Sequence, residues 1–365
     1  MRKILPVLLI GVMVFSLAAC GGGDSGDPEE QGYEPDAGYE IAMITDVGTI
    51  DDKSFNQGTW EGVQAFAVAN GIGYKYYMPT EQSTDAYLAS IQLAIEGGAK
   101  IIVTPGFLFQ NPIYIAQELY PDIHFVLIDG VPTNEDWETR IDPNTVGILF
   151  AEEQSGYLAG YAAVIEGYTK LGFMGGMAVP AVVRFGYGFA EGAEAAAAEL
   201  GIASVELKYT YTNSFDATPE AQTLATSWYA DGTEVIFACG GAMGNSVMAA
   251  AEAQGAKVVG VDVDQSGESE TVITSAMKDL AEAVIQALAQ FYDGTFPGGQ
   301  SIILGADKHG VALPMATSKF ETFTDETYDA VYESLADGAV ALKTDQDAAD
   351  PKALGLSIVN VTLIE

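Results

Sequence analysis

The sequence contains few of the residues that bind metals or form disulfides. It has two cysteines and two histidines among 365 residues. Cys20 and Cys239 are far apart, and His124 and His309 form no cluster with them, so no metal-binding motif is present. We therefore expect neither a metal nor a cofactor. Cys239 ends an apolar run at 235–239 and is expected to be a small buried residue.

Basic residues are also scarce. The chain has 15 lysines and arginines against 51 aspartates and glutamates, for a formal net charge of −36. Proteins that bind nucleic acid neutralise phosphates with lysine and arginine. This composition therefore excludes nucleic acid as an expected partner. We interpret the acidity as a soluble, self-repelling surface.

Long apolar runs are missing except at the N-terminus. Arg2 and Lys3 precede an uncharged apolar run at 4–17, which predicts a secretory signal peptide at 1–19. The run is too short to span a bilayer stably. It ends in Leu17-Ala18-Ala19-Cys20, which resembles a lipoprotein cleavage site. We expect Cys20 to become the first residue of the mature chain and to carry lipid, including palmitate, on the extracytoplasmic side of the cell membrane.

Cleavage at this site has two consequences for the mature chain. It would leave 13 basic residues against 51 acidic ones, a formal charge of −38, and a single thiol that cannot form an intrachain disulfide. Residues 21–39 contain mostly Gly, Asp, Glu, Pro and Ser, with almost no aliphatic side chains. Such a segment cannot bury enough surface to offset its ordering entropy. Residues 20–39 are therefore predicted to form a flexible acidic tether.

From residue 39 onward, short β-rich apolar runs alternate with alanine-rich helical patterns. This alternation predicts βαβ units and parallel sheets, and therefore an α/β fold. The pattern restarts after residue 150, and about 325 residues in two such series exceed one ordinary core. Two lobes are therefore expected. The predicted strands are 40–45, 73–77, 101–104, 124–128, 146–150, 170–174, 204–211, 234–238 and 257–261, and the predicted helices are 58–69, 86–95, 155–165, 186–200, 245–253 and 278–292.

Parallel α/β sheets place ligands at the carboxyl ends of their strands. Residues that follow predicted strands are therefore candidate ligand contacts. They include Asp46, Asp129, Asp262 and the glycine pair Gly240-Gly241. Each one alone would be an ordinary turn or cap. Four such positions together predict a binding site.

Several short motifs occur in order along the chain. They are ITDVGTIDDKSFNQ at 44–57, WEG at 60–62, YPD at 120–122, FVLID at 125–129, SGYLAG at 155–160, GFMGG at 172–176, GVDVDQ at 260–265 and TSAMK at 274–278. These motifs resemble those of the basic membrane protein (BMP) lipoproteins, a family that includes the purine nucleoside receptors of ABC importers. The resemblance covers roughly residues 40–310 and weakens after Gly310.

This resemblance implies a type I periplasmic binding protein fold, with two Rossmann-like lobes joined by a three-segment hinge. Lobe 1 is then expected over 40–150 plus 275–312, and lobe 2 over 151–274 plus 313–365. The implied protein is a monomeric, lipid-anchored receptor that delivers a nucleoside to ABC permease subunits and is not an enzyme. Hinge closure would trap the ligand. A strand-like run at 358–364 has no assigned place.

Two aromatic residues are candidates to stack on a flat base. Phe55, in a polar loop beside Asn56, would offer one face, and Phe215 in lobe 2 would offer the other. Phe185 is the reserve candidate for the second ring. Stacking of this kind contributes about 1 to 3 kcal/mol per base.

The polar candidates have separate roles in this prediction. Asp129 would accept hydrogen bonds from a purine amine or imino group, and Asp46 and Asn56 would read the base or the sugar or, for Asp46, cap a loop. Asp262 can accept from both hydroxyls of a ribose cis-diol. Lys278, placed at the start of a helix, would donate to ribose oxygens and pair with Asp262. Gly241 would allow the backbone to approach the ligand closely.

Other classes of protein share some of these sequence features. A nucleoside hydrolase would need clustered aspartates, and here the acids are scattered over both lobes. The loop at 240–244 departs from the Gly-x-Gly-x-x-Gly spacing of dinucleotide-binding loops. A riboflavin-binding lipoprotein of the same fold and a ligand sensor lipoprotein remain as alternatives, because a flavin also needs two aromatic faces and acceptors for sugar hydroxyls.

Overall fold

The computed structural model describes residues 38–364. The predicted signal peptide, the predicted lipidation site at Cys20 and residues 20–37 of the predicted tether lie outside the described residues. None of the described helices is both long and apolar enough to cross a membrane.

The first sheet has six parallel strands in the order β11-β5-β4-β3-β1-β2. Parallel strands are usually covered by helices on both faces, so their residues are buried on both sides. The strands here fit that rule, because β1, β3 and most of β4 are fully buried. They are β1 (Ile41–Ile44), β2 (Tyr74–Tyr77), β3 (Ile101–Pro105), β4 (His124–Ile128), β5 (Thr145–Phe150) and β11 (Gln300–Leu304).

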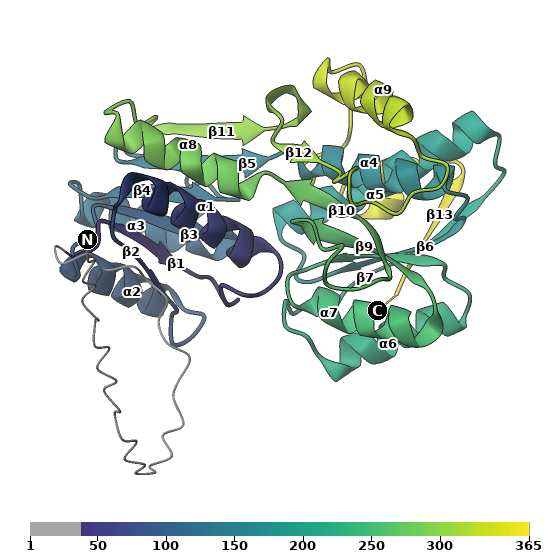
Figure 1. Cartoon of the computed structure of the whole chain (residues 1–365), viewed down its shortest axis with the longest axis horizontal. Helices are drawn as coiled ribbons and strands as arrows, with labels where there is room; N and C mark the ends of the chain where they lie inside the picture. Colours follow the sequence, from purple (N-terminus) through teal and green to yellow (C-terminus); the bar gives the residue numbers. More distant parts are fainter. Residues whose placement is uncertain (1–37, 365) are drawn as a thin grey trace, which may run out of the picture. The chain divides into compact units, whose positions relative to one another are not determined.

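Alternate residues of these strands pack against different helices. Ile41 and Met43 of β1 belong to the core under α1 (Phe55–Asn70) and α8 (Leu280–Tyr292). Ala42 and Ile44 point the other way, into a core with α2 (Thr84–Glu96) and α3 (Gln110–Leu119). Figure 1 shows α1 and α8 lying near each other in the first half of the molecule. They pack so closely that a Cβ on Gly62 would lie 2.6 Å from a backbone oxygen of α8.

The second sheet has seven strands in the order β12-β10-β9-β8-β6-β7-β13. All neighbours are parallel except β12, which runs antiparallel to β10. Its inner strand order, β7-β6-β8-β9-β10, repeats the order β2-β1-β3-β4-β5 of the first sheet. The strands are β6 (Lys170–Gly175), β7 (Val205–Tyr211), β8 (Val235–Cys239), β9 (Lys257–Asp262), β10 (Val272–Lys278), β12 (Val311–Ala312) and β13 (Val359–Leu363).

Helices also cover both faces of the second sheet. On one face, α6 (Pro219–Ala230) and α7 (Met243–Gln254) share a core with strand residues such as Ile236. On the other face, α4 (Glu152–Ile165) and α5 (Pro180–Leu200) pack with residues such as Phe237. Figure 1 shows α9 (Asp325–Ala336) and β13 completing this half. Short 3-10 helices occur at Phe107–Phe109 (η1), Ala306–Lys308 (η2) and Pro351–Leu354 (η3).

The chain changes sheets at three connections: between β5 and α4, between β10 and α8, and between β11 and β12. The first change coincides with the lobe boundary predicted after residue 150. The boundary predicted between 274 and 275 falls inside β10, which belongs to the second sheet as far as Lys278. Likewise β12 pairs with β10, so 311–312 belong to the second sheet. The extra strand β13, unassigned from sequence, pairs with β7.

Several local predictions were wrong. The helix predicted from residue 278 begins at Leu280, because the Asp279 side chain caps it by accepting from the backbone of Glu282. Lys278 is therefore the last residue of β10. Phe55 is the first residue of α1 and does not lie in a loop. Three helices were not predicted, namely α3, α6 and α9.

Candidate ligand-binding site

A cavity of about 310 Å³ lies at the carboxyl ends of strands from both sheets. All of the ligand contacts predicted from the sequence line this cavity. They come from loops, helix starts and strand ends throughout the chain, and they are Asp46, Phe55, Asn56, Asp129, Phe215, Gly241, Asp262 and Lys278. The reserve candidate Phe185 lines it as well. The fold therefore brings the predicted set together at one place.

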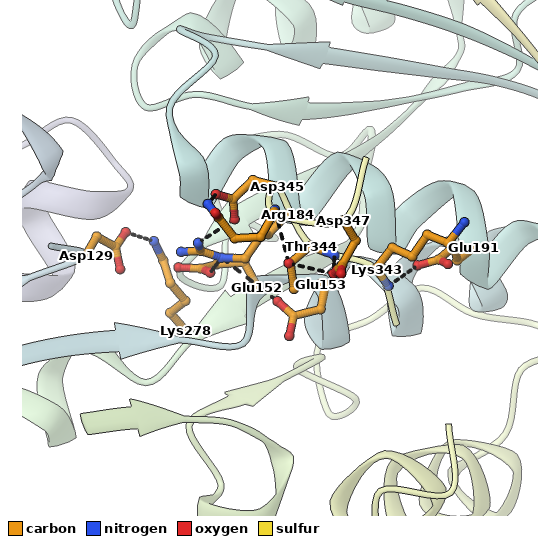
Figure 2. Close-up of polar contacts among 11 residues, drawn as sticks. Asp129, Glu152, Glu153, Arg184, Glu191, Lys278, Lys343, Thr344, Asp345 and Asp347 are labelled. Atoms are coloured by element: carbon orange, nitrogen blue, oxygen red, sulfur yellow. Dashed lines mark hydrogen bonds and ion pairs between the residues drawn. The ribbon is translucent and has the colours of Figure 1, made fainter. Parts of the chain in front are cut away.

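Lys278 joins two carboxylates at the base of this cavity. Its Nζ lies 2.5 Å from Oδ2 of Asp129 and 3.1 Å from Oδ1 of Asp262. Only 3% of the Lys278 side chain is exposed, against 7% and 8% for the two aspartates. Burial opposes the lysine charge, but the two carboxylates outweigh it and raise the pKa of Lys278 above its ordinary value. Figure 2 shows the contact with Asp129.

Asp129 and Asp262 occupy equivalent positions in the two sheets, at the ends of β4 and β9. Both have left-handed backbones, with φ of 56° and 68°. Such a conformation is uncommon outside glycine and is often found at functional sites. The two carboxylates differ in their partners. Asp262 also accepts a hydrogen bond from the Ser54 hydroxyl at 2.6 Å, whereas Asp129 Oδ1 is buried and has no partner among the described residues.

Asp129 is a weaker acid than an exposed aspartate. Burial raises the pKa of Asp129 to about 7, with the ammonium of Lys278 opposing the rise and the carboxylates of Glu152 and Asp262 adding to it. A buried polar atom normally finds a hydrogen-bond partner, because leaving it bare costs about 1 to 3 kcal/mol. Asp129 Oδ1 therefore presents an unused acceptor at a cavity wall.

The loop after β1 forms a polar wall of the cavity. Asp46 Oδ1 accepts from the backbone of Gly48 at 2.8 Å and from Asn56 Nδ2 at 2.9 Å. Burial raises the pKa of Asp46 to about 6, against these hydrogen bonds. Asp46 thus caps its own loop, which is one of the two roles considered from the sequence, and it also lines the cavity.

Asp52 lines the cavity too. Its carboxylate accepts from the backbone N–H groups of Ser54, Asn56 and Gln57 and from Asn56 Nδ2, at 2.9–3.1 Å. These are unpaired donors at the start of α1, where a carboxylate is a favourable cap. Asp52 thereby fixes the helix turn that carries Phe55.

The aromatic candidates have different environments. Phe55 and Phe215 are partly buried, whereas Phe185 is 1% exposed and packs edge-on against Phe237 at 5.8 Å. The Lys278 ammonium lies 4.4 Å from the ring centre of Phe55 and 5.4 Å from that of Phe185. Of these rings, Phe185 is the one embedded in the core.

Glycines allow Phe215 to reach the cavity. A Cβ on Gly176 would lie 2.4 Å from the Phe215 ring, so only glycine leaves room for it there. The Phe215 carbonyl accepts from the backbone of Met243 at 2.8 Å, beside Gly241, whose φ is 55°. The loops after β6, β7 and β8 therefore hold this ring in place together.

Sequence reasoning missed some of the cavity lining. Phe107 and Leu108 in η1, and Val179, Ala181 and Val182 around the start of α5, all border the space. The available sequence signal for η1 was Pro105-Gly106, which directly follows the predicted strand 101–104. In the structure Gly106 has a φ of 114° and lies against Asp46. This apolar lining, interrupted by convergent carboxylates and one lysine, is typical of a small-molecule site.

The fold and cavity therefore define a two-sheet ligand-binding protein of the periplasmic receptor type. The model of the family described as ABC transporter substrate-binding protein PnrA-like matches residues 39–340. The chain belongs to this family, which confirms the resemblance to the BMP lipoproteins. Its members are substrate-binding proteins of ABC transporters and not enzymes.

Individual relatives agree with this assignment. The chain is 28% identical to the "ABC transporter nucleoside-binding protein BmpA" of Lactococcus lactis, over 91% of this chain and 95% of that protein. It is 30% identical to "Basic membrane protein A" of Borreliella burgdorferi, over 88% and 90% of the two chains. An ABC solute-binding protein from Aeropyrum pernix has the same fold, with a TM-score of 0.72, 24% identity and coverage of 85% and 95%. The predicted α/β receptor fold is thereby confirmed.

Proposed function

We propose that this protein captures a purine nucleoside for an ABC importer. The observation that carries the proposal is the unpartnered, buried Oδ1 of Asp129 at a cavity that Phe55 and Phe215 also line. A flat base between two rings, with an N–H directed at this oxygen, would satisfy it. A Lactococcus relative that bears a nucleoside-binding name supports the same ligand class.

The charges around the cavity narrow the ligand class further. The acidic side chains that border it are Asp46, Asp52, Asp129, Asp216 and Asp262, and Lys278 is the one cation among the described residues that do so. A phosphate group would face this excess of carboxylates. Neutral nucleosides are therefore favoured over nucleotides, and ligand donors over ligand acceptors.

The size of the cavity suits a small ligand. Its volume of about 310 Å³ lies at the lower end of the range of about 300 to 1,000 Å³ that is usual for ligand sites. Riboflavin remains the alternative outcome of the binding test.

Calorimetry on the purified protein tests the proposal. The panel is guanosine, inosine, adenosine, their free bases, a nucleoside monophosphate and riboflavin. We expect at least one purine nucleoside to bind far more tightly than its free base and its monophosphate. Tighter binding of riboflavin, or no binding of any nucleoside, would contradict the proposal.

We also propose that Cys20 anchors the protein by lipid on the extracytoplasmic side of the membrane, where it acts as a monomer with its permease. Cys20→Ala should abolish incorporation of labelled palmitate and release the protein from the membrane fraction. The cavity lies in a different part of the chain, so nucleoside affinity should be unchanged. Palmitate incorporation into the Cys20→Ala protein would contradict this anchor.

A further inference from the structure

One face of α5 contacts a segment that lies beyond the family match. We call residues 341–358 the C-terminal strap; it connects the region after α9 to β13 and includes η3. The family model ends at residue 340. The helix residues that contact the strap and its end, Arg184, Tyr187, Glu191 and Glu194, are spaced three, four and three apart, which places them on one helix face.

Each of these four residues holds a different part of the strap. Tyr187 donates to the carbonyl of Ala348 at 3.1 Å, and Glu191 accepts from the backbone of Lys343 at 3.0 Å. The Glu194 carboxylate accepts from three successive backbone N–H groups, those of residues 357–359, at 2.8–3.1 Å. The strap is therefore bonded to α5 along its length.

The fourth contact lies next to the ligand cavity. Arg184 Nη1 donates to Oδ1 of Asp345 in the strap at 2.9 Å, while its Nε donates to Oε2 of Glu152 at 2.6 Å. Glu153 Oε2 lies 3.9 Å from the same Nε. Figure 2 shows Arg184 between these carboxylates, near the pair formed by Lys278 and Asp129. Arg184 thereby links the strap to Glu152, the first residue of α4, at the point where the chain enters the second half.

Arg184 also belongs to the helix turn that borders the cavity. Ala181, Val182 and Phe185, on the same turn, line the cavity. Glu152 is fully buried, and its Oε1 has no partner among the described residues. A buried carboxylate in this position depends on its arginine, because an unpaired buried charge is strongly unfavourable. A second carboxylate on Arg184 fixes the guanidinium, and so fixes both Glu152 and the cavity turn.

We propose that Asp345 is a positioning residue for ligand binding: through Arg184, the C-terminal strap holds the first turns of α5 in the geometry that the cavity requires. Asp345 does not line the cavity. One of the two measurements that test this inference is ligand affinity, and that measurement rests on the proposed binding function. The other is backbone hydrogen exchange, which needs no ligand.

The competing explanation is that α4 and α5 hold each other without the strap. Their backbones touch at glycines, since a Cβ on Gly156 would lie 2.2 Å from the Phe185 carbonyl and one on Gly188 would lie 1.9 Å from the Glu153 carbonyl. If these contacts suffice, loss of the Asp345 charge should leave the cavity turn unchanged. The two explanations therefore predict different results for one substitution.

The test compares Asp345→Asn with three other full-length variants. Asp345→Glu keeps a carboxylate within reach of Arg184. Gln346→Ala removes only the donor to Asp345 Oδ2, at 2.6 Å, and is the milder variant if Asp345→Asn fails to fold. Asp329→Asn changes the same charge at an exposed position on α9 and serves as the matched control.

The measurements are inosine affinity by calorimetry and hydrogen exchange of the backbone amides of residues 182–186 without ligand. In Asp345→Asn we expect affinity to fall by about fivefold or more, a usual size for coupling between sites, and these amides to exchange faster. Gln346→Ala should change both in the same direction but less. In both affinity and exchange rate, Asp345→Glu should be closer to the wild type than Asp345→Asn is. Asp329→Asn should have the same affinity and exchange rates as the wild type.

Unchanged affinity or unchanged exchange in Asp345→Asn would overturn the inference, as would a glutamate variant no better than the asparagine variant. A wild-type protein that bound no nucleoside would contradict the proposed function instead. In that case the exchange rates alone would decide whether the strap holds the turn.

Discussion

The two halves of this protein share a strand plan but supply different chemistry to the cavity. In each half an aspartate with positive φ stands at the carboxyl end of the fourth strand along the chain: Asp129 directly follows β4, and Asp262 is the last residue of β9. Both aspartates pair with Lys278. Around them the halves differ. After β1 the first half presents a polar loop in which Asp46 accepts a hydrogen bond from Asn56 of α1. The second half instead presents glycines that make room for Phe215.

This difference shows how one backbone geometry can be used in two ways. The strand ends set where the carboxylates lie, and the neighbouring loops decide what else each carboxylate can bind. Asp262 already accepts a hydrogen bond from Ser54 of the first half, while Asp129 Oδ1 has no hydrogen-bond partner within residues 38–364.

The largest effect should come from Lys278, because it is shared by both halves. Lys278→Met would leave two buried carboxylates without their cation, and breaking a buried pair in this way costs about 3 to 5 kcal/mol of unfolding free energy. Urea denaturation at neutral pH measures this loss. Lys319→Met removes an exposed ion pair with Glu270 and should cost about 0 to 1 kcal/mol. Equal losses in the two variants would contradict the central role of Lys278.

The aromatic rings should divide between affinity and stability. Phe55→Ala and Phe215→Ala, one in each half, should each weaken nucleoside binding by about 1 to 3 kcal/mol with little change in the apo melting temperature. Phe185→Ala should cost about 3 to 5 kcal/mol of stability, because its ring is buried against Phe237. Calorimetry and apo melting on the same samples distinguish the two roles. A large melting loss with unchanged affinity in Phe55→Ala would refute stacking by that ring.

The equivalent aspartates Asp129 and Asp262 should bind different parts of the ligand. We expect wild-type protein to prefer guanosine over 2′-deoxyguanosine, and Asp262→Asn to reduce that preference, because Asp262 is assigned to the ribose diol. A hydrogen bond to a charged group is worth about 1.5 to 3 kcal/mol. Asp129→Asn should weaken the binding of guanosine and of 2′-deoxyguanosine equally. If Asp129→Asn alone removed the sugar preference, the two assignments would have to be exchanged.

The smallest effect concerns pH and the polar loop of the first half. The pKa of Asp46 is raised from 3.8 to about 6 in the folded protein, so between these values the folded state binds more protons than the unfolded state. Stability from this group therefore falls as pH rises from about 4 to about 7. The asparagine in Asp46→Asn cannot titrate. The contributions of the other titratable groups to stability cancel when this variant and the wild type are compared at each pH. Urea denaturation across this range should show the wild type losing stability relative to Asp46→Asn; a constant difference would argue against a raised pKa.

Local sequence signals accounted for much of the fold. The apolar strands and most helices around them were predictable because their periodicity reflects burial on two faces of a sheet. The errors lie at element ends and in the helices α3, α6 and α9, which were not predicted. Phe55 was read as a loop residue since it follows polar residues, yet Asp52 caps a helix there. Helix α6 went unpredicted despite a Thr218 cap followed by a proline at its start.

The candidate site, like the fold, was only partly predictable from the sequence. The sequence by itself determined which residues stand at strand ends, and motifs resembling the BMP family indicated which of them to consider. The pair between Lys278 and Asp262 was predicted from the sequence. Only the tertiary structure decided that Asp129 joins this pair, and that Asp345 meets Arg184. Periodicity along a chain reports which face of an element is buried. It does not report which strand ends face each other, because those contacts depend on how two whole sheets and their connections pack.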